Sequence, residues 1–191
     1  MLESLYIARS RIRRELLALF FTNPSQEYYL RQLRRMLGYS AGNIRRELLR
    51  FQEDNLFKTR KAGNLVYYSL NTEHPLFQEL KGIVSKTVGV EGSLRAALST
   101  IAGVRIAFIY GSFAAGKERG TSDIDLMIIG NPNMVHLNRE ITQLEERLRR
   151  DINPTIYSPE QYREKKRARS GFIMDLLENP RIILIGKEDD L

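Results

Sequence analysis

One stretch of the sequence constrains the fold more than any other. Residues 106–130 read IAFIYGSFAAGKERGTSDIDLMIIG, in which two apolar, strand-like runs flank a Gly-Ser turn and a polar loop. Because strand side chains alternate between the two faces of a sheet, Asp123 and Asp125 point the same way and Ile124 points into the core. The segment therefore predicts two strands of one sheet, with a pair of carboxylates at the start of the second strand.

The residue types in this stretch indicate a chemistry. Neighbouring carboxylates repel each other unless a cation lies between them, and Mg²⁺ prefers one or two carboxylates together with phosphate oxygens and water. Gly111 permits a sharp turn, and Ser112 begins a helical turn whose free N–H groups suit a phosphate. A metal site and a phosphate site in one segment are the outline of a nucleotidyl-transfer site.

The whole string resembles the minimal nucleotidyltransferases of the DNA polymerase β superfamily. The resemblance implies Mg²⁺ and an NTP as cofactors, with ATP the first candidate, and Asp123 and Asp125 as catalytic metal ligands. It also implies that Gly111 and Ser112 hold the phosphates. Lys117 or Arg119 either neutralises the leaving group or is an ordinary loop charge that keeps the surface soluble. The alternative is an ordinary hairpin with a solvated acidic edge. It explains neither the Gly-Ser turn nor the placement of both carboxylates on one face of the strand. The motif residues are Gly111, Ser112, Ala114, Gly116, Ser122, Asp123, Asp125 and Leu126.

One position departs from the family pattern. Active members commonly carry a third carboxylate on the following strand, where this chain has Asn153 in the text INPTIY. An amide oxygen can contact a metal, but it adds no charge and cannot act as a base. Asp151, in a shifted register, or Glu118 could substitute, so the sequence is compatible with both a catalytic and a non-catalytic site.

The basic charge is concentrated in the N-terminal part. Residues 1–75 carry 13 Lys and Arg against 7 Asp and Glu, whereas residues 76–191 carry 17 against 16. This asymmetry indicates a polyanionic partner for the first module.

The pattern of that module predicts helices at about residues 9–21, 30–37 and 40–54, followed by a hairpin of residues 56–60 and 65–70. Three helices and a hairpin resemble a winged helix-turn-helix of the ArsR-like branch over residues 9–71. The resemblance implies duplex DNA as the partner, transcription regulation as the role and a homodimer as the assembly. Binding to RNA instead would appear as a preference for single strands or tRNA.

Helix geometry separates the core face of the third helix from its outer face. Ile44, Leu48 and Phe51 share one side, and polar residues that reach base edges and phosphates share the other. A solvated charged face is the competing interpretation. The predicted DNA-binding residues are Ser40, Asn43, Arg45, Arg46 and Arg50 on the helix and Arg60, Lys61 and Asn64 on the wing.

The remaining elements complete an α+β organisation, with a mixed-sheet nucleotidyltransferase fold after the winged module. We expect domains at residues 1–74 and 103–191, joined by a helical connector at 75–102 that is interrupted near 89–92. Within the second domain we expect a helix at 134–150 with a stripe of Val135, Ile141, Leu144 and Leu148. A strand at 152–157, a Ser158-capped basic helix and a strand near 181–185 follow.

The sequence also excludes several classes. With no cysteine, the chain has no disulfides and no thiolate chemistry, and its longest apolar run near the start, residues 16–21, is too short to span a membrane. We therefore expect a cytoplasmic protein with no membrane partner. The two resemblances leave two functions open. One is a regulator that transfers a nucleoside monophosphate to a protein side chain, a tRNA end or a small molecule, and the nucleotidyltransferase resemblance implies a partner toxin as one such acceptor. The other is a regulator whose transferase-like domain only senses nucleotide or mediates dimerisation.

Overall fold

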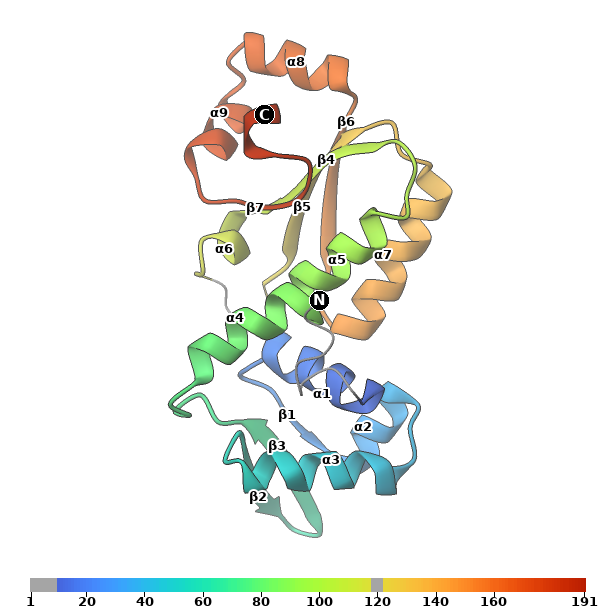
Figure 1. Ribbon diagram of the computed structural model, residues 1–191, viewed down its shortest axis with the longest axis vertical. Helices are drawn as coiled ribbons and strands as arrows, with labels where there is room; N and C mark the ends of the chain where they lie inside the picture. The colour runs from blue at the N-terminus through green and yellow to red at the C-terminus, as the bar shows by residue number, and fades with distance from the viewer. Residues whose placement is uncertain (1–9, 118–121) are drawn as a thin grey trace. The chain divides into compact units, whose positions relative to one another are not determined.

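The computed structural model describes residues 10–117 and 122–191 and divides the chain into two compact units, Met1–Gly92 and Ser93–Leu191. Among the described residues, no helix combines the length and the apolar character that crossing a bilayer requires. The first unit contains α1 (Arg11–Thr22), β1 (Glu27–Tyr29), α2 (Leu30–Leu37), α3 (Ala41–Glu53), β2 (Phe57–Ala62), β3 (Leu65–Leu70) and α4 (Phe77–Thr87) (Figure 1).

The helix boundaries of the first unit follow local signals. Ser10 and Ser40 cap α1 and α3, each accepting a hydrogen bond from the main-chain N–H three residues later. Gly38 ends α2 in the left-handed region, at φ +72°. The expected three helices and hairpin are present, and the hairpin turns at Gly63 and Asn64 because Ala62 pairs with Leu65.

The sheet of the first unit has a strand that the sequence pattern did not indicate. β1 pairs antiparallel with β3, giving the strand order β1-β3-β2. Tyr28 and Tyr68 are buried in the core, whereas Tyr29 and Tyr67 meet edge to face at 5.6 Å between ring centroids. These four tyrosines therefore pack this unit.

The second unit is built on a four-stranded mixed sheet of order β6-β5-β4-β7. β5 and β6 are parallel, and β4 is antiparallel to both β5 and β7. The elements are α5 (Val90–Leu98), β4 (Val104–Tyr110), α6 (Gly111–Ala114), β5 (Ile124–Gly130), α7 (Met134–Leu148), β6 (Ile152–Tyr157), α8 (Pro159–Arg167), α9 (Gly171–Glu178) and β7 (Ile182–Ile185), and α5 itself begins just before the boundary between the units.

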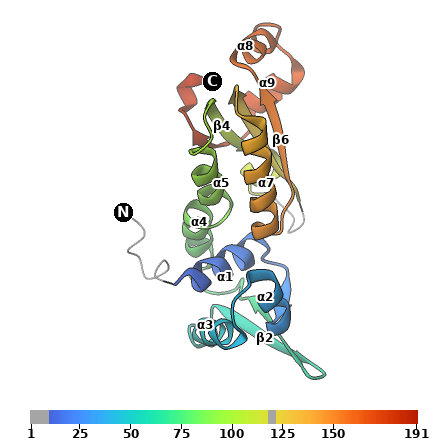
Figure 2. The same cartoon turned by 90° about the vertical axis from the view of Figure 1, so that its right-hand side faces the viewer.

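The two faces of this sheet are covered by different helices. α8 and α9 pack on the face that carries Phe108 and Met127, and their residues Tyr162, Ile173 and Leu176 join that apolar cluster. α5 and α7 lie side by side on the opposite face (Figure 2). The face that carries Phe108 and Met127 is called the α9 face below.

Three expectations about this region need correction. The expected interruption is present at residues 88–89, but it is shorter than expected, so α5 already begins at Val90; α9 was not foreseen at all. Val135 is 82% exposed, because it lies six residues before Ile141 and so points away from the buried side of α7, where Leu137 is found.

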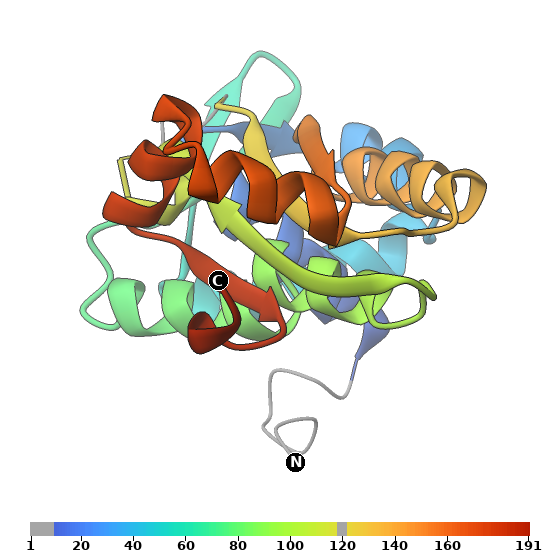
Figure 3. The same cartoon turned by 90° about the horizontal axis from the view of Figure 1, so that it is seen from above.

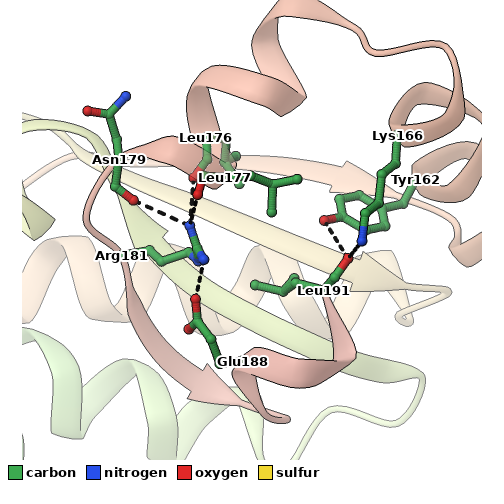
Figure 4. A network of polar contacts seen from close by, with 8 residues as sticks. All are labelled: Tyr162, Lys166, Leu176, Leu177, Asn179, Arg181, Glu188 and Leu191. Carbon is green, nitrogen blue, oxygen red and sulfur yellow. Dashed lines mark hydrogen bonds and ion pairs between the residues drawn. The ribbon is translucent and has the colours of Figure 1, made fainter.

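The chain end is held by a polar network (Figure 4). The Arg181 guanidinium donates to the carbonyls of Leu176 at 3.1 Å and Leu177 at 2.8 Å, and it pairs with Glu188. The carbonyls at the end of a helix lack partners within the helix, so these bonds fix the junction between α9 and β7.

Candidate functional site

The turn after β4 requires a glycine for two reasons. Gly111 has φ +71°, a conformation that L side chains rarely adopt. A Cβ at this position would lie 2.3 Å from Oδ2 of Asp125, so a side chain would displace the carboxylate. The chain thus presses its backbone directly against the acidic group, which the sequence pattern alone did not indicate.

The two carboxylates lie at the start of a strand, on the same face of the sheet, as the alternation of strand side chains predicted. Asp123 directly precedes β5, Asp125 is its second residue, and Ile124 between them is fully buried. Burial raises the pKa of Asp125, and the negative charge of Asp123 raises that pKa further. The two groups are therefore close enough to interact, and a cation between them would relieve both effects.

Asn153 completes this cluster. In the parallel pairing of β5 with β6, Asn153 is opposite Asp125, and its Nδ2 donates to Oδ2 of Asp123 at 3.0 Å. Asn153, and not Asp151, thus occupies the position expected for the third carboxylate. Asp151 is one step outside the ladder and contributes its main-chain carbonyl, which accepts the N–H of Ile124 at 2.9 Å.

The donor set suits a hard cation that brings other ligands with it. Among residues 10–117 and 122–191, no group of three or more His, Cys, Asp and Glu side chains is arranged to hold a metal. Two carboxylates and the amide oxygen of Asn153 nevertheless match Mg²⁺, which usually takes its remaining ligands from phosphates and water.

The phosphate side of the site begins at Gly111. α6 spans four residues and starts at Gly111, so phosphate contacts would come from Ser112 and the first main-chain N–H groups rather than from a long helix. Lys117 is exposed, and its N–H donates to the Ser112 carbonyl at 3.0 Å. Arg119 and Glu118 lie outside the described residues.

The outer face of α3 has the character that helix geometry predicted. Ile44, Leu48 and Phe51 are buried, and the polar residues of the opposite side are exposed. Ser40 caps the helix, so its hydroxyl already accepts the Asn43 N–H. The exposed residues of this face are Asn43, Arg45, Arg46 and Arg50.

The wing residues differ from one another in availability. Lys61 and Asn64 are exposed at the hairpin end. Arg60 pairs with Glu27 of β1, and its guanidinium lies 4.9 Å from the ring centroid of Tyr67. Arg60 therefore braces the three-stranded sheet, a role that depends on the unforeseen strand β1.

The predicted binding residues did not include the arginines of α2. An open pocket of about 460 Å³ is lined by three of its arginines together with the turn that follows. The signal was present, since these arginines recur on the outer side of an eight-residue helix. The lining residues are Arg31, Arg34, Arg35, Gly38 and Tyr39.

Three basic residues of α8 make contacts within the second unit. Arg163 pairs with Glu160, Lys165 lies 5.3 Å from the Tyr157 ring centroid, and Lys166 donates to the carbonyl of Leu191. These contacts favour an ordinary solvated face over a surface that recruits a substrate.

Comparison with models of known protein families gives a match within the second unit. Residues 93–184 match the sequence model of the family described as polymerase beta, nucleotidyltransferase. The chain therefore contains a nucleotidyltransferase-type domain, and the fold of that part is the α+β arrangement described above. No curated protein sequence matches the chain.

Two solved structures show weaker likeness. One is NolR from Sinorhizobium fredii, with 20% identity over 46% of this chain and 80% of that chain, at a TM-score of 0.36. The other is a toxin-antitoxin with AMP-PNP, with 17% identity over 52% of this chain and 76% of that chain, at a TM-score of 0.39.

Proposed function

We propose that this protein is a DNA-binding transcriptional regulator whose second unit transfers a nucleoside monophosphate from a Mg-NTP to an acceptor hydroxyl. The observation that carries the transferase part is the contact of Gly111 with Asp125, which puts the phosphate turn directly against the carboxylate pair. The match of residues 93–184 to a nucleotidyltransferase family supports the same reaction class.

The chain's own residues would divide the work between holding charge and positioning phosphate. Asp123 and Asp125 would hold Mg²⁺, which when bound would neutralise negative charge on the phosphates and on the attacking oxygen. Ser112 and the amides after it would orient the outer phosphates so that pyrophosphate leaves in line with the attack. Asn153 would keep Asp123 oriented through its amide.

The decisive experiment for the transferase is transfer of label from α-labelled ATP, and then from the other NTPs, with Mg²⁺ or Mn²⁺ in host lysate. The Asp123→Ala/Asp125→Ala double variant is the control. A labelled protein, RNA or small molecule that disappears with the double variant identifies the acceptor class. Nucleotide binding without label transfer would reject the transferase.

A second function is favoured by one observation. Because Asn153 replaces the expected acid and already donates to Asp123, the site lacks a base at that position. The domain would then act as a nucleotide sensor or a dimerisation module of the regulator. Asn153→Asp separates the two functions. If the variant gains transfer activity, the amide impairs the wild-type site. If the wild type already labels an acceptor and the variant labels it no better, the amide suffices for transfer.

The DNA-binding part rests on the first unit. The order of α2, the turn at Gly38, α3 and the β2–β3 hairpin supports a winged helix-turn-helix, and Asn43, Arg46 and Arg50 would face the major groove. Titration of duplex DNA against single-stranded DNA and tRNA of equal length tests this assignment. Tighter binding to tRNA than to every duplex would overturn it.

A further inference from the structure

The catalytic end of the sheet has an aromatic side as well as an acidic one. Tyr110 pairs with Asp125 across β4 and β5, and Asp125 pairs with Asn153 across β5 and β6. Residues opposite one another in a sheet point to the same face, so all three side chains belong to the α9 face. An aromatic ring, a carboxylate and an amide thus form one row at the end of the sheet where Gly111 turns.

The ring of Tyr110 crosses the middle strand. Its hydroxyl shares a hydrogen bond of 3.2 Å with Oγ1 of Thr155 on β6. Since Thr155 is opposite Met127, the side chain of Tyr110 reaches over β5 from the level of Asp125 to that of Met127. The ring therefore borders the carboxylate site on its inner side and is fixed there by the bond.

Phe172 extends this aromatic side into solvent. It belongs to the first turn of α9, and its ring meets that of Tyr110 edge to face, with 5.9 Å between centroids. Phe172 is 40% exposed, although Ile173 beside it is completely buried. α6 and α9 lie next to each other in both Figure 1 and Figure 3. Tyr110, which Phe172 contacts, directly precedes the phosphate turn at Gly111.

We infer that Phe172 and Tyr110 form the nucleobase platform of this site, an inference that rests on the proposed function because it requires a nucleotide at the carboxylates. If the phosphates bind at Ser112, the base of the same nucleotide lies within reach of the surrounding surface. Bases stack on exposed aromatic rings, and Phe172 offers such a ring beside the polar site. Stacking requires a flat π face and little hydrogen bonding, so the platform would accept any base and favour the larger purines.

The chain offers a clean reporter for this contact, because it contains no tryptophan. Phe172→Trp introduces a single fluorophore on the platform, and Val135→Trp introduces one on an exposed position of α7, on the other face of the sheet. Titration with MgATP is expected to quench the fluorescence of Phe172→Trp saturably and to leave that of Val135→Trp unchanged. Equal responses in the two variants would overturn the platform.

Affinity measurements separate stacking from phosphate binding. Phe172→Ala is expected to weaken MgATP binding about tenfold, in the range that loss of one base-aromatic stack produces, and to leave inorganic tripolyphosphate binding unchanged. Phe172→Leu preserves an apolar side chain and tests whether loss of packing alone explains the change. Equal weakening of MgATP and tripolyphosphate would assign Phe172 a structural role and reject the inference.

The wild-type protein distinguishes the two levels of failure. If calorimetry detects neither MgATP nor tripolyphosphate binding, the proposed nucleotide site fails and the platform fails with it. If the wild type binds MgATP and Phe172→Ala binds it equally well, the nucleotide site stands and only the platform is rejected. An acceptor that docks on Phe172 instead would appear as unchanged MgATP affinity with reduced labelling of the acceptor.

Discussion

Replacing Asn153 by aspartate tests the metal site without relying on activity. In the wild type, the Asn153 amide donates to Oδ2 of Asp123 at 3.0 Å. Asn153→Asp removes that hydrogen bond, which contributes about 1 kcal/mol. It also places two carboxylates roughly 4 Å apart near solvent, where their repulsion costs about 1 kcal/mol. The apo protein is therefore expected to lose about 2 kcal/mol of unfolding free energy.

Magnesium should reverse this loss. A ligand that binds only the folded state at 100 times its Kd adds about 2.7 kcal/mol, so saturating Mg²⁺ should restore the stability of Asn153→Asp. In a thermal melt with EDTA, the second unit should unfold roughly 10 °C lower than in the wild type, since each kcal/mol shifts Tm by about 4–8 °C in a domain of this size. Adding Mg²⁺ should raise the Tm of the variant more than that of the wild type.

Two matched variants complete the test. Asn153→Ala removes the hydrogen bond and the amide oxygen without adding charge, so its loss should be about 1 kcal/mol and its response to Mg²⁺ should be no larger than that of the wild type. Asp123→Asn/Asn153→Asp exchanges the amide and the carboxylate, and it should recover most of the loss in EDTA. If Asn153→Asp and Asn153→Ala melt together in EDTA and neither responds to Mg²⁺ more than the wild type, the carboxylates do not share a cation site.

Three further predictions follow from the same geometry. Gly111→Ala should lower the unfolding free energy and abolish nucleotide binding, because its Cβ would strike Asp125. Gly116→Ala has a similar φ (+66°), but among the described residues no atom lies within 4 Å of its Cβ, so it should show only the backbone strain of about 1 kcal/mol in urea titrations. Comparable losses in the two variants would refute the contact. Since the folded state raises the pKa of Asp125, its charge opposes folding above that pKa, and the cost is relieved as pH falls through it. Asp125→Asn should therefore be more stable than the wild type at pH 7 in EDTA, with the difference shrinking toward pH 4, and a difference that grows on acidification would contradict the assignment. For DNA, Arg46→Ala should reduce the slope of log affinity against log salt by about 1, whereas Arg60→Ala should change it less, because Glu27 already pairs with Arg60. Mobility shifts at several salt concentrations measure both, and an unchanged slope in Arg46→Ala would remove that residue from the interface.

Local signals in the sequence were enough for most boundaries. The caps at Ser40 and Ser158, the stop at Gly38 and the turn at Gly63 act within a few residues, so they can be recognised without knowing the rest of the fold. The alternation around Ile124 likewise predicted the shared face of the two carboxylates. Matching of residues 93–184 to a nucleotidyltransferase family agrees with the chemistry inferred from that segment.

The errors arose where long-range contacts decided the outcome. β1 is three residues long and exists because β3 pairs with it, which no local pattern indicates. α9 lacks a side-chain N-cap hydrogen bond and is held instead by the burial of Ile173 and Leu176 on the sheet. The prediction that Val135 belongs to the apolar stripe of α7 was wrong, because it ignored the angular position of this residue on the helix.

What the sequence determined by itself was the chemical character of the site: two carboxylates of one parity, a glycine turn before them and an amide where an acid was expected. Only the tertiary structure decided which groups meet. The register of β5 and β6 brought Asn153 to Asp123, the antiparallel pairing of β4 put Gly111 and Tyr110 beside Asp125, and α9 added Phe172 from a distant part of the sequence. The physical reason is that side-chain parity is a property of one strand, whereas register depends on the packing of the whole sheet.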